Sequence, residues 1–233
     1  MYSIVFLDAD DTVFDFKKAE KKAFKQSFEK YNYNGDYNFL EERYHKINKT
    51  LWSLAEKNQI TIEKLKMERF KLLFNDLKID YPVFDFGELY LGFLSKQTFL
   101  LNGAVSICRY ISERSKIIMV TNGIDTVQKS RLKCSDIEKY ISGIVTSEEA
   151  GVSKPNPDIF EFAVKKYSLT DNKSDMIMIG DNLLSDILGG INFGIDTCWF
   201  NPEANKNNTG INPAYEISEL SGIRSIFEKN QFF

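Results

Sequence analysis

The spacing of hydrophobic and polar positions changes twice along the chain, near residues 15 and 100. A short apolar run, Ile4–Leu7, opens the chain and is typical of a strand buried on both faces of a sheet. From residue 16 onward, apolar side chains such as Ala19, Ala23 and Phe24 recur at helical spacing. We predict helices over residues 16–31, 38–58 and 61–79, with no strand of comparable strength before residue 100.

Beyond residue 100, strand-like and helix-like segments alternate. Repeated alternation of this kind favours a parallel sheet with helices on both of its faces. We predict strands over residues 117–120, 143–146, 176–179 and 197–200, helices over 104–114, 125–133, 158–167, 185–193 and 219–228, and a polar loop over 201–212.

This pattern predicts an α/β fold with two parts. The strand Ile4–Leu7 joins the later strands in one Rossmann-like core domain, residues 1–15 and 96–233. The helical stretch 16–95 is then an all-α insertion, or cap domain. Because the insertion directly follows the first strand, we expect it to cover the carboxyl end of that strand as a lid.

Composition and charge exclude several classes of protein. Of the 233 residues, 43% are hydrophobic and 27% are charged, which is ordinary for a globular chain. A net charge of -3 and a pI near 5.4 argue against a nucleic acid polymer as partner. No apolar run reaches the ~20 residues that span a bilayer, and no signal peptide is recognised, so we expect a cytoplasmic protein without a membrane partner.

Cysteine and histidine offer little chemistry. Cys108, Cys134 and Cys198 are odd in number and widely separated, which argues against a disulfide framework or a structural zinc site. We expect them to be reduced and structural. The single histidine, His45, lies in a charged helical segment with no Cys or second His nearby, so we assign it no catalytic or metal role.

Carboxylates crowd the end of the first predicted strand. Asp8, Asp10 and Asp11 lie within four positions, where repulsion is unfavourable unless a cation or an anchored ligand offsets it. Ligands of open α/β sheets bind beyond the carboxyl ends of the strands, which is where these groups would lie. A single Asp at such a place is more often a turn residue or a helix N-cap, so the cluster indicates a site where one member would not.

Later strand ends carry groups suited to phosphate. Thr121, Asn122 and Gly123 offer a hydroxyl, an amide and close backbone approach, although the same triplet also makes an ordinary capped turn. Lys154 lies between a predicted strand and a helix in a segment that two prolines stiffen, which places a point charge at little cost in side-chain freedom. The alternative interpretation of Lys154 is a solvated surface lysine.

A final strand end carries two more carboxylates. Gly180 leaves backbone room, and Asp181 would project where Asp8 projects, so that carboxylates of different strands meet around one hard cation. Asp181 alone could instead be a helix N-cap. Asp186, five residues later, would support the water shell of a metal or cap the next helix.

Together, these motifs resemble those of the haloacid dehalogenase-like (HAD) hydrolase superfamily, most of whose members are magnesium-dependent phosphatases. The resemblance consists of a strand followed by Asp-x-Asp-x-Thr, a Thr at a second strand end, a Lys-Pro segment, and Gly-Asp-x-x-x-x-Asp. The four motifs keep the superfamily's order between residues 8 and 186. The core domain therefore matches the superfamily well, whereas the insertion matches only in position and type.

The resemblance implies a role for each matching residue. Asp8 would be the nucleophile that forms an aspartyl-phosphate, and Asp10 the general acid and base, kept protonatable by neighbouring negative charge. Thr12 would buttress the turn. The phosphate would be bound by Thr121, Asn122 and Lys154, and Mg²⁺ by the Asp8 carboxylate, the Asp10 backbone carbonyl and the Asp181 carboxylate.

One position departs from the pattern. Asp11 stands where many relatives have Gly, and Asp tolerates the left-handed backbone that such a turn can require. The Asp-Ala-Asp-Asp-Thr form with a helical insertion resembles the branch of pyrimidine 5'-nucleotidase-like phosphatases. We therefore expect a small-molecule phosphate ester as substrate, a pyrimidine nucleoside 5'-monophosphate, and a monomer or homodimer.

Three alternatives remain open. A phosphosugar or phosphoglycolate phosphatase would differ only in the leaving group that the insertion admits. A 2-haloacid dehalogenase on the same core generally lacks a carboxylate at the position of Asp10 and needs no metal, so Asp10 argues against it. A catalytically silent binding protein would not need the full set of reactive side chains.

Overall fold

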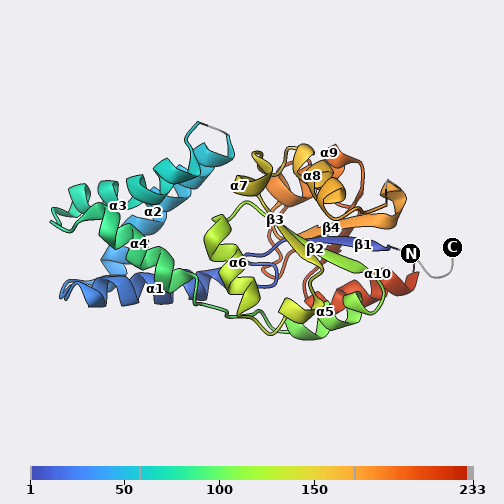
Figure 1. Cartoon of the computed structure of the whole chain (residues 1–233), viewed down its shortest axis with the longest axis horizontal. Coiled ribbons are helices and arrows are strands. Elements are labelled where there is room, and N and C mark those ends of the chain that lie inside the picture. The colour runs from blue at the N-terminus through green and yellow to red at the C-terminus, as the bar shows by residue number, and fades with distance from the viewer. Residues whose placement is uncertain (1, 58, 171, 230–233) are drawn as a thin grey trace. The chain divides into compact units, whose positions relative to one another are not determined.

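The chain forms two compact units in the computed structural model, which describes residues 2–57, 59–170 and 172–229 (Figure 1). One unit consists of Met1–Phe16 and Phe99–Phe233, and the other of Lys17–Thr98. Within the described ranges, no helix has both the length and the apolar character needed to cross a bilayer.

A six-stranded parallel sheet forms the centre of the first unit, with the strand order β3-β2-β1-β4-β5-β6. The α/β fold class predicted from the sequence is thereby confirmed. The last strand of the sheet, β6, was not predicted, because a three-residue strand at the sheet edge has too few positions to show an alternating pattern. The strands are β1 (Ile4–Leu7), β2 (Lys116–Thr121), β3 (Gly143–Thr146), β4 (Met176–Gly180), β5 (Asp196–Phe200) and β6 (Tyr215–Ile217).

The strand β1 lies at the point where the strand order reverses. Leu7 pairs with Met119 of β2 on one side and with Ile179 of β4 on the other. From β1 the order runs to β2 and β3 in one direction and to β4 and β5 in the other. Such a topological switch point is where doubly wound sheets bind their ligands, outside the carboxyl ends of the strands.

Helices cover both faces of this sheet, as Figure 1 shows for α5 and α10 on one side and α8 and α9 on the other. Side chains of β1 alternate accordingly. Val5 and Leu7 pack in a cluster with residues of α5 and α10, whereas Ile4 and Phe6 pack in a cluster with residues of α8. The helices are α5 (Ala104–Ser112), α6 (Asp125–Lys133), α7 (Ser147–Ala150), α8 (Asp158–Lys166), α9 (Leu188–Phe193) and α10 (Ile223–Lys229).

Helices are the regular secondary structure of the second unit in its described residues. Its helices are α1 (Phe16–Lys30, whose first residue belongs to the other unit), α2 (Tyr37–Glu56), α3 (Ile62–Leu77) and α4 (Val83–Leu94). The first three match the predicted helices to within two residues at each end, except that residue 58, the predicted end of the second, lies outside the described residues. The helix α4 was missed, because its mostly apolar sequence with two glycines shows no clear polar face.

Aromatic side chains make the core of the helical unit. Phe28 lies 4.6 Å from Phe86 between ring centroids, and Phe70 lies 4.9 Å from Phe86 and 5.1 Å from Tyr90. All four side chains are buried. The aromatic stripes of the sequence are therefore core positions, and each such contact adds to the free energy of burial.

Candidate active site

The turn after β1 presents the acidic residues. Asp11 has a φ of 58°, in the left-handed region that Asp tolerates, and its Oδ1 accepts a hydrogen bond of 3.2 Å from the backbone N–H of Phe16. This confirms that Asp can replace Gly in the turn. The backbone N–H groups of Val13 and Phe14 both donate to the carbonyl of Ala9, at 3.1 and 2.9 Å, and so tighten the turn.

The hydroxyl of Thr12 joins two strand ends. It lies 3.2 Å from Oδ2 of Asp8 and 3.3 Å from Oδ1 of Asp181, and it accepts a hydrogen bond of 3.1 Å from the backbone N–H of Asp181. The side chain of Thr12 is fully buried. Thr12 therefore holds the end of β1 against the end of β4, as a buttress should.

Lys154 is the cation of the site. Its Nζ lies 2.6 Å from Oδ1 of Asp8 and 2.7 Å from Oδ1 of Asp186, and it donates to the carbonyl of Val120 at 2.6 Å. The residue is 1% exposed, which is compatible with a charge only because three oxygens surround it. The alternative of a solvated lysine is thus excluded.

Asn122 and Thr121 lie beside Lys154, at the end of β2. The Asn122 side chain accepts a hydrogen bond of 2.8 Å from the Lys154 backbone N–H and donates one of 3.0 Å to its carbonyl. Asn122 therefore positions the lysine, while its contact with phosphate stays a prediction. The buried hydroxyl of Thr121 accepts a hydrogen bond of 3.0 Å from the backbone N–H of Gly123, and its contact with phosphate also stays a prediction.

Three carboxylates converge at the ends of β1 and β4. One carboxylate oxygen from each of Asp8, Asp181 and Asp186 lies within 4.8 Å of the other two. Asn182, rather than Asp181, caps the following helical turn by accepting from two backbone N–H groups. From the sequence, Asp186 would support the water shell of a metal or cap the next helix. In the structure its carboxylate belongs to this cluster, and Oδ2 also accepts a hydrogen bond of 3.0 Å from the backbone N–H of Asn182.

Gly180 makes room for that arrangement. A Cβ at this position would lie 2.5 Å from the Cβ of Asp186 and 2.3 Å from its Oδ2. A side chain at residue 180 would therefore push the Asp186 carboxylate away from Lys154. The need for backbone room at Gly180 was predicted, and the structure shows which side chain uses it.

The cluster is electrostatically strained by its own charges. Burial and the neighbouring Asp186 raise the pKa of Asp8 to about 7, although Lys154 opposes this. Burial and the charges of Asp186 and Asp8 raise the pKa of Asp181 to about 8. Burial would lower the pKa of Lys154, but Asp186 and Asp8 outweigh it and hold that pKa above its ordinary value. A bound divalent cation would relieve this repulsion.

Asp10 has partners that the sequence did not reveal. Its Oδ2 accepts from Nε2 of Gln128 and its Oδ1 from Nη1 of Arg131, both at 2.5 Å and both from α6. We expected negatively charged neighbours to keep Asp10 protonatable. This is wrong for the groups in direct contact with its carboxylate, which are the Arg131 guanidinium and the Gln128 amide. The available signal was a helical stripe of Ile124, Val127, Gln128 and Arg131, in which two polar residues share an apolar face.

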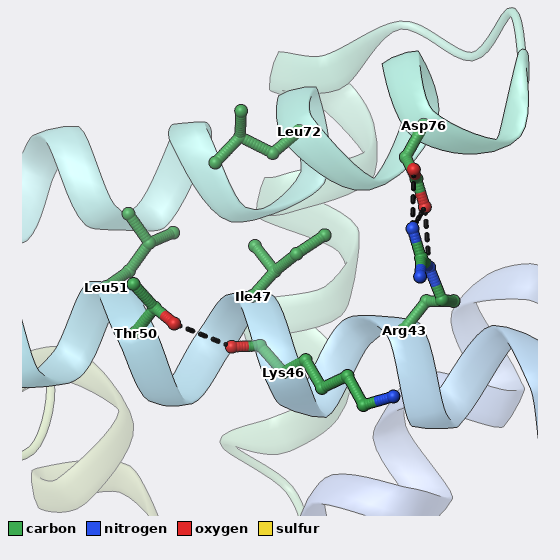
Figure 2. A pocket seen from close by; sticks show the side chains of 7 residues that line it. All are labelled: Arg43, Lys46, Ile47, Thr50, Leu51, Leu72 and Asp76. Atoms are coloured by element: carbon green, nitrogen blue, oxygen red, sulfur yellow. Dashed lines mark hydrogen bonds and ion pairs between the residues drawn. The ribbon is translucent and has the colours of Figure 1, made fainter.

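A separate pocket lies in the helical unit, between α2 and α3 (Figure 2). This open pocket has a volume of about 430 Å³. Figure 2 shows the Arg43 guanidinium paired with the Asp76 carboxylate at one end. The two N–O distances of this pair are 2.6 and 2.7 Å. Because Arg43 pairs with Asp76 and Lys46 with Glu42, the pocket offers little to a phosphate. The lining residues are Arg43, Lys46, Ile47, Thr50, Leu51, Leu72 and Asp76, none of which was a predicted site residue.

Comparison with known proteins identifies the family. The model of the haloacid dehalogenase-like hydrolase family matches residues 2–194, which include all of the site residues described above. The chain belongs to this family. As a HAD-like hydrolase it is an enzyme, and the superfamily resemblance of its four motifs is confirmed.

Three relatives align with this HAD-like hydrolase over almost its whole length. The pyrimidine 5'-nucleotidase YjjG of Escherichia coli is 32% identical, with 97% of this chain and 98% of the relative covered. The pyrimidine 5'-nucleotidase PynA of Streptococcus pneumoniae is 30% identical, with 98% and 96% covered. The magnesium-bound crystal structure of the HAD-hydrolase YfnB of Bacillus subtilis superimposes with a TM-score of 0.88 at 29% identity, with 97% and 99% covered.

Proposed function

We propose that this HAD-like hydrolase is a magnesium-dependent phosphomonoester hydrolase that acts on pyrimidine nucleoside 5'-monophosphates through an aspartyl-phosphate. The observation that carries the proposal is the convergence of Asp8, Asp181 and Asp186 beside the buried Lys154, at the switch point of the sheet. We further propose that residues 1–15 and 96–233 act as the core domain and residues 16–95 as a cap domain.

The donor set fits Mg²⁺. The groups are hard oxygen ligands, and the raised pKa values of Asp8 and Asp181 indicate that the ionised cluster needs a cation. The Asp8 carboxylate, the Asp10 backbone carbonyl and the Asp181 carboxylate would hold the ion, with Asp186 beside them. When bound, the ion would neutralise charge on the transferring phosphoryl group.

In the first step, a carboxylate oxygen of Asp8 forms a bond to phosphorus while the bond between phosphorus and the ester oxygen breaks. Protonated Asp10 donates its proton to the departing oxygen, so the nucleoside leaves as an alcohol. Lys154, hydrogen-bonded to Asp8, orients the nucleophile and offers positive charge to the phosphoryl oxygens. The Thr121 hydroxyl would donate to a second oxygen.

In the second step, Asp10 takes a proton from water as that water attacks the phosphorus of the aspartyl-phosphate. The bond between phosphorus and the Asp8 oxygen then breaks, which releases inorganic phosphate and restores the Asp8 carboxylate. The proton that Asp10 gave to the alcohol is thereby replaced. The dehalogenase alternative gives Asp10 no such task, which is why its presence supports phosphate chemistry.

The two nucleotidase relatives, at 30% and 32% identity over nearly the whole chain, support a nucleotide as the substrate and a nucleoside as the leaving group. The proposal is tested by phosphate release from purified protein supplied with pyrimidine and purine nucleoside 5'-monophosphates, sugar phosphates and phosphoglycolate. Each assay is run with Mg²⁺ and with EDTA. Asp8→Asn serves as the inactive control, because an amide cannot attack phosphorus.

We expect hydrolysis of pyrimidine nucleoside monophosphates with Mg²⁺ and none with EDTA or with Asp8→Asn. Hydrolysis confined to sugar phosphates would support the proposed phosphatase reaction but contradict the proposed nucleotide substrate. Release of halide from 2-haloacids that EDTA leaves unchanged would favour the dehalogenase. A folded protein that is inactive on all of these compounds in Mg²⁺ would contradict the proposed function.

A further inference from the structure

The carboxylate of Asp10 is bound on both of its oxygens by one helix. Gln128 donates to Oδ2 and Arg131 to Oδ1, each at 2.5 Å, across 118 and 121 residues of sequence. A carboxylate has about four acceptor positions, so two donors leave acceptor capacity on each oxygen. These contacts can hold the orientation of Asp10 without preventing it from exchanging a proton.

Arg131 is itself held in place. Its side chain is fully buried, its guanidinium carbon lies 4.5 Å from the centroid of the Phe14 ring, and its Nη1 lies 3.3 Å from Oε1 of Gln128. Stacking on an aromatic face and a planar fork of donors keep a guanidinium in one orientation. The N–H group that Arg131 donates to Asp10 is therefore held in a fixed position, unlike the donor of a surface ion pair.

Gln128 is restrained by the backbone beside it. A Cβ on Gly123 would lie 2.2 Å from Nε2 and 2.9 Å from Cδ of Gln128, so the amide of Gln128 packs directly against that glycine. Gln128 is also buried. The turn after β2 and the first two turns of α6 thus form one rigid support for the side chain of Asp10.

We propose that Gln128 and Arg131 are positioning residues, which hold the Asp10 carboxylate in the orientation that serves proton exchange with the leaving group. This inference rests on the proposed function, since it gives Asp10 the role of general acid. It predicts that loss of Arg131 weakens acid catalysis in particular, and that binding of the phosphate group is little changed.

The test compares two leaving groups in Arg131→Met. A nucleoside 5'-hydroxyl is a poor leaving group that needs a proton, whereas p-nitrophenolate leaves without one. We measure kcat/KM, which reports the steps up to the aspartyl-phosphate. We expect a fall of about 100-fold or more for uridine 5'-monophosphate, the size usual for general acid catalysis, and a fall below about fivefold for p-nitrophenyl phosphate.

Two further variants separate positioning from folding. Arg131→Lys keeps a cationic donor and should recover part of the loss on the nucleotide. Lys133→Met removes an exposed cation from the same helix and should leave both substrates unchanged. Asp10→Asn should show the same difference between leaving groups as Arg131→Met. Equal losses on both substrates for Arg131→Met, or no loss on either, would overturn the inference.

Thermal unfolding gives a readout that does not depend on activity. If Asp10 and Arg131 interact directly, the Tm decreases of Asp10→Asn and Arg131→Met should sum to more than the decrease of the double variant. Additive decreases would overturn the inference even for an inactive enzyme. An inactive wild type with coupled decreases would instead contradict the proposed function, while the direct interaction of Asp10 with Arg131 would stand.

Discussion

Nζ of Lys154 lies 2.6 Å from Oδ1 of Asp8, although 146 residues separate them in the sequence. The same nitrogen lies 2.7 Å from Asp186, and all three side chains are buried. One cation thus balances two buried carboxylates. Both the free energy of unfolding and the reactivity of Asp8 should depend on it.

Replacing Lys154 by Met should therefore affect stability and activity together. Removing one partner of a buried ion pair leaves an uncompensated charge and costs about 3 kcal/mol, and removing a donor to the reacting group lowers kcat by about 100-fold or more. Urea unfolding at pH 8 and phosphate release measure the two effects. Lys166→Met is the control, because its pair with Glu149 is partly exposed and should change stability by less than about 1 kcal/mol. Unfolding of Lys154→Met at the wild-type urea concentration would contradict this prediction.

Removal of the Asp181 carboxylate should have opposite effects on the stability of the folded protein with and without Mg²⁺. The pKa of Asp181, about 8 in the folded protein, lies above the value of about 3.9 in an unfolded chain. The folded state therefore binds more protons between these values, and its stability falls as the pH rises from about 4 to about 8. Without Mg²⁺ at pH 8, Asp181→Asn should be more stable than the wild type.

With Mg²⁺ the order should reverse. The wild type gains stability from a ligand that binds only the folded state, whereas Asp181→Asn lacks a ligand group and should gain less. Thermal unfolding at increasing Mg²⁺ concentration measures both effects. Asp136→Asn, at an exposed position, should behave as the wild type does. Equal Mg²⁺-induced increases in Tm for wild type and Asp181→Asn would show that Asp181 does not bind the ion.

Replacing glycine by alanine should lower the stability of the protein at Gly180 and raise it at Gly92. Gly180→Ala would place a Cβ 2.3–2.5 Å from the Asp186 side chain, so we expect lower stability and a weaker Mg²⁺ response. Gly92→Ala, in α4, meets nothing within 4 Å and should stabilise the helix by about 0.5–1 kcal/mol. Urea unfolding of both proteins is the measurement. A stability increase in Gly180→Ala would mean that Asp186 moves freely.

The single histidine should make the helical unit more stable in mild acid. Nδ1 of His45 lies 3.2 Å from Oε2 of Glu20, and Nε2 lies 3.7 Å from Glu41. The hydrogen bond to Glu20 raises the pKa of His45 above its ordinary value, although partial burial opposes this. A raised folded pKa contributes stability that is complete below the unfolded pKa, near about 6.5, and that disappears as the pH rises through the folded pKa.

His45→Gln keeps a donor for Glu20 without a titrating proton. We therefore expect this variant to be less stable than the wild type at pH 5 and closer to it at pH 9, as judged by the difference in Tm between the two proteins. A difference that is constant over this range would show that the charge of His45 contributes nothing to stability.

Local patterns in the sequence determined much of the fold and the chemistry of the site. The strand Ile4–Leu7 ends where it was predicted to end, because a buried apolar run followed by charged turn residues is a local signal. The acidic positions Asp8 and Asp181 follow buried strands for the same reason. Parallel strands bring their carboxyl ends to one edge of the sheet, so the sequence sufficed to predict that these groups meet.

The tertiary structure alone decided which side chains act on one another. Asp10 receives its donors from Gln128 and Arg131, and Asn122 holds the backbone of Lys154, across separations of 32 to 121 residues. No local pattern encodes such pairs, because the position of a helix against a strand end depends on the packing of the whole sheet. The helix α4 was missed for a related reason. Its Phe86 and Tyr90 complete the aromatic core of the helical unit, and burial among other rings stabilises a segment whose own sequence has no clear polar face.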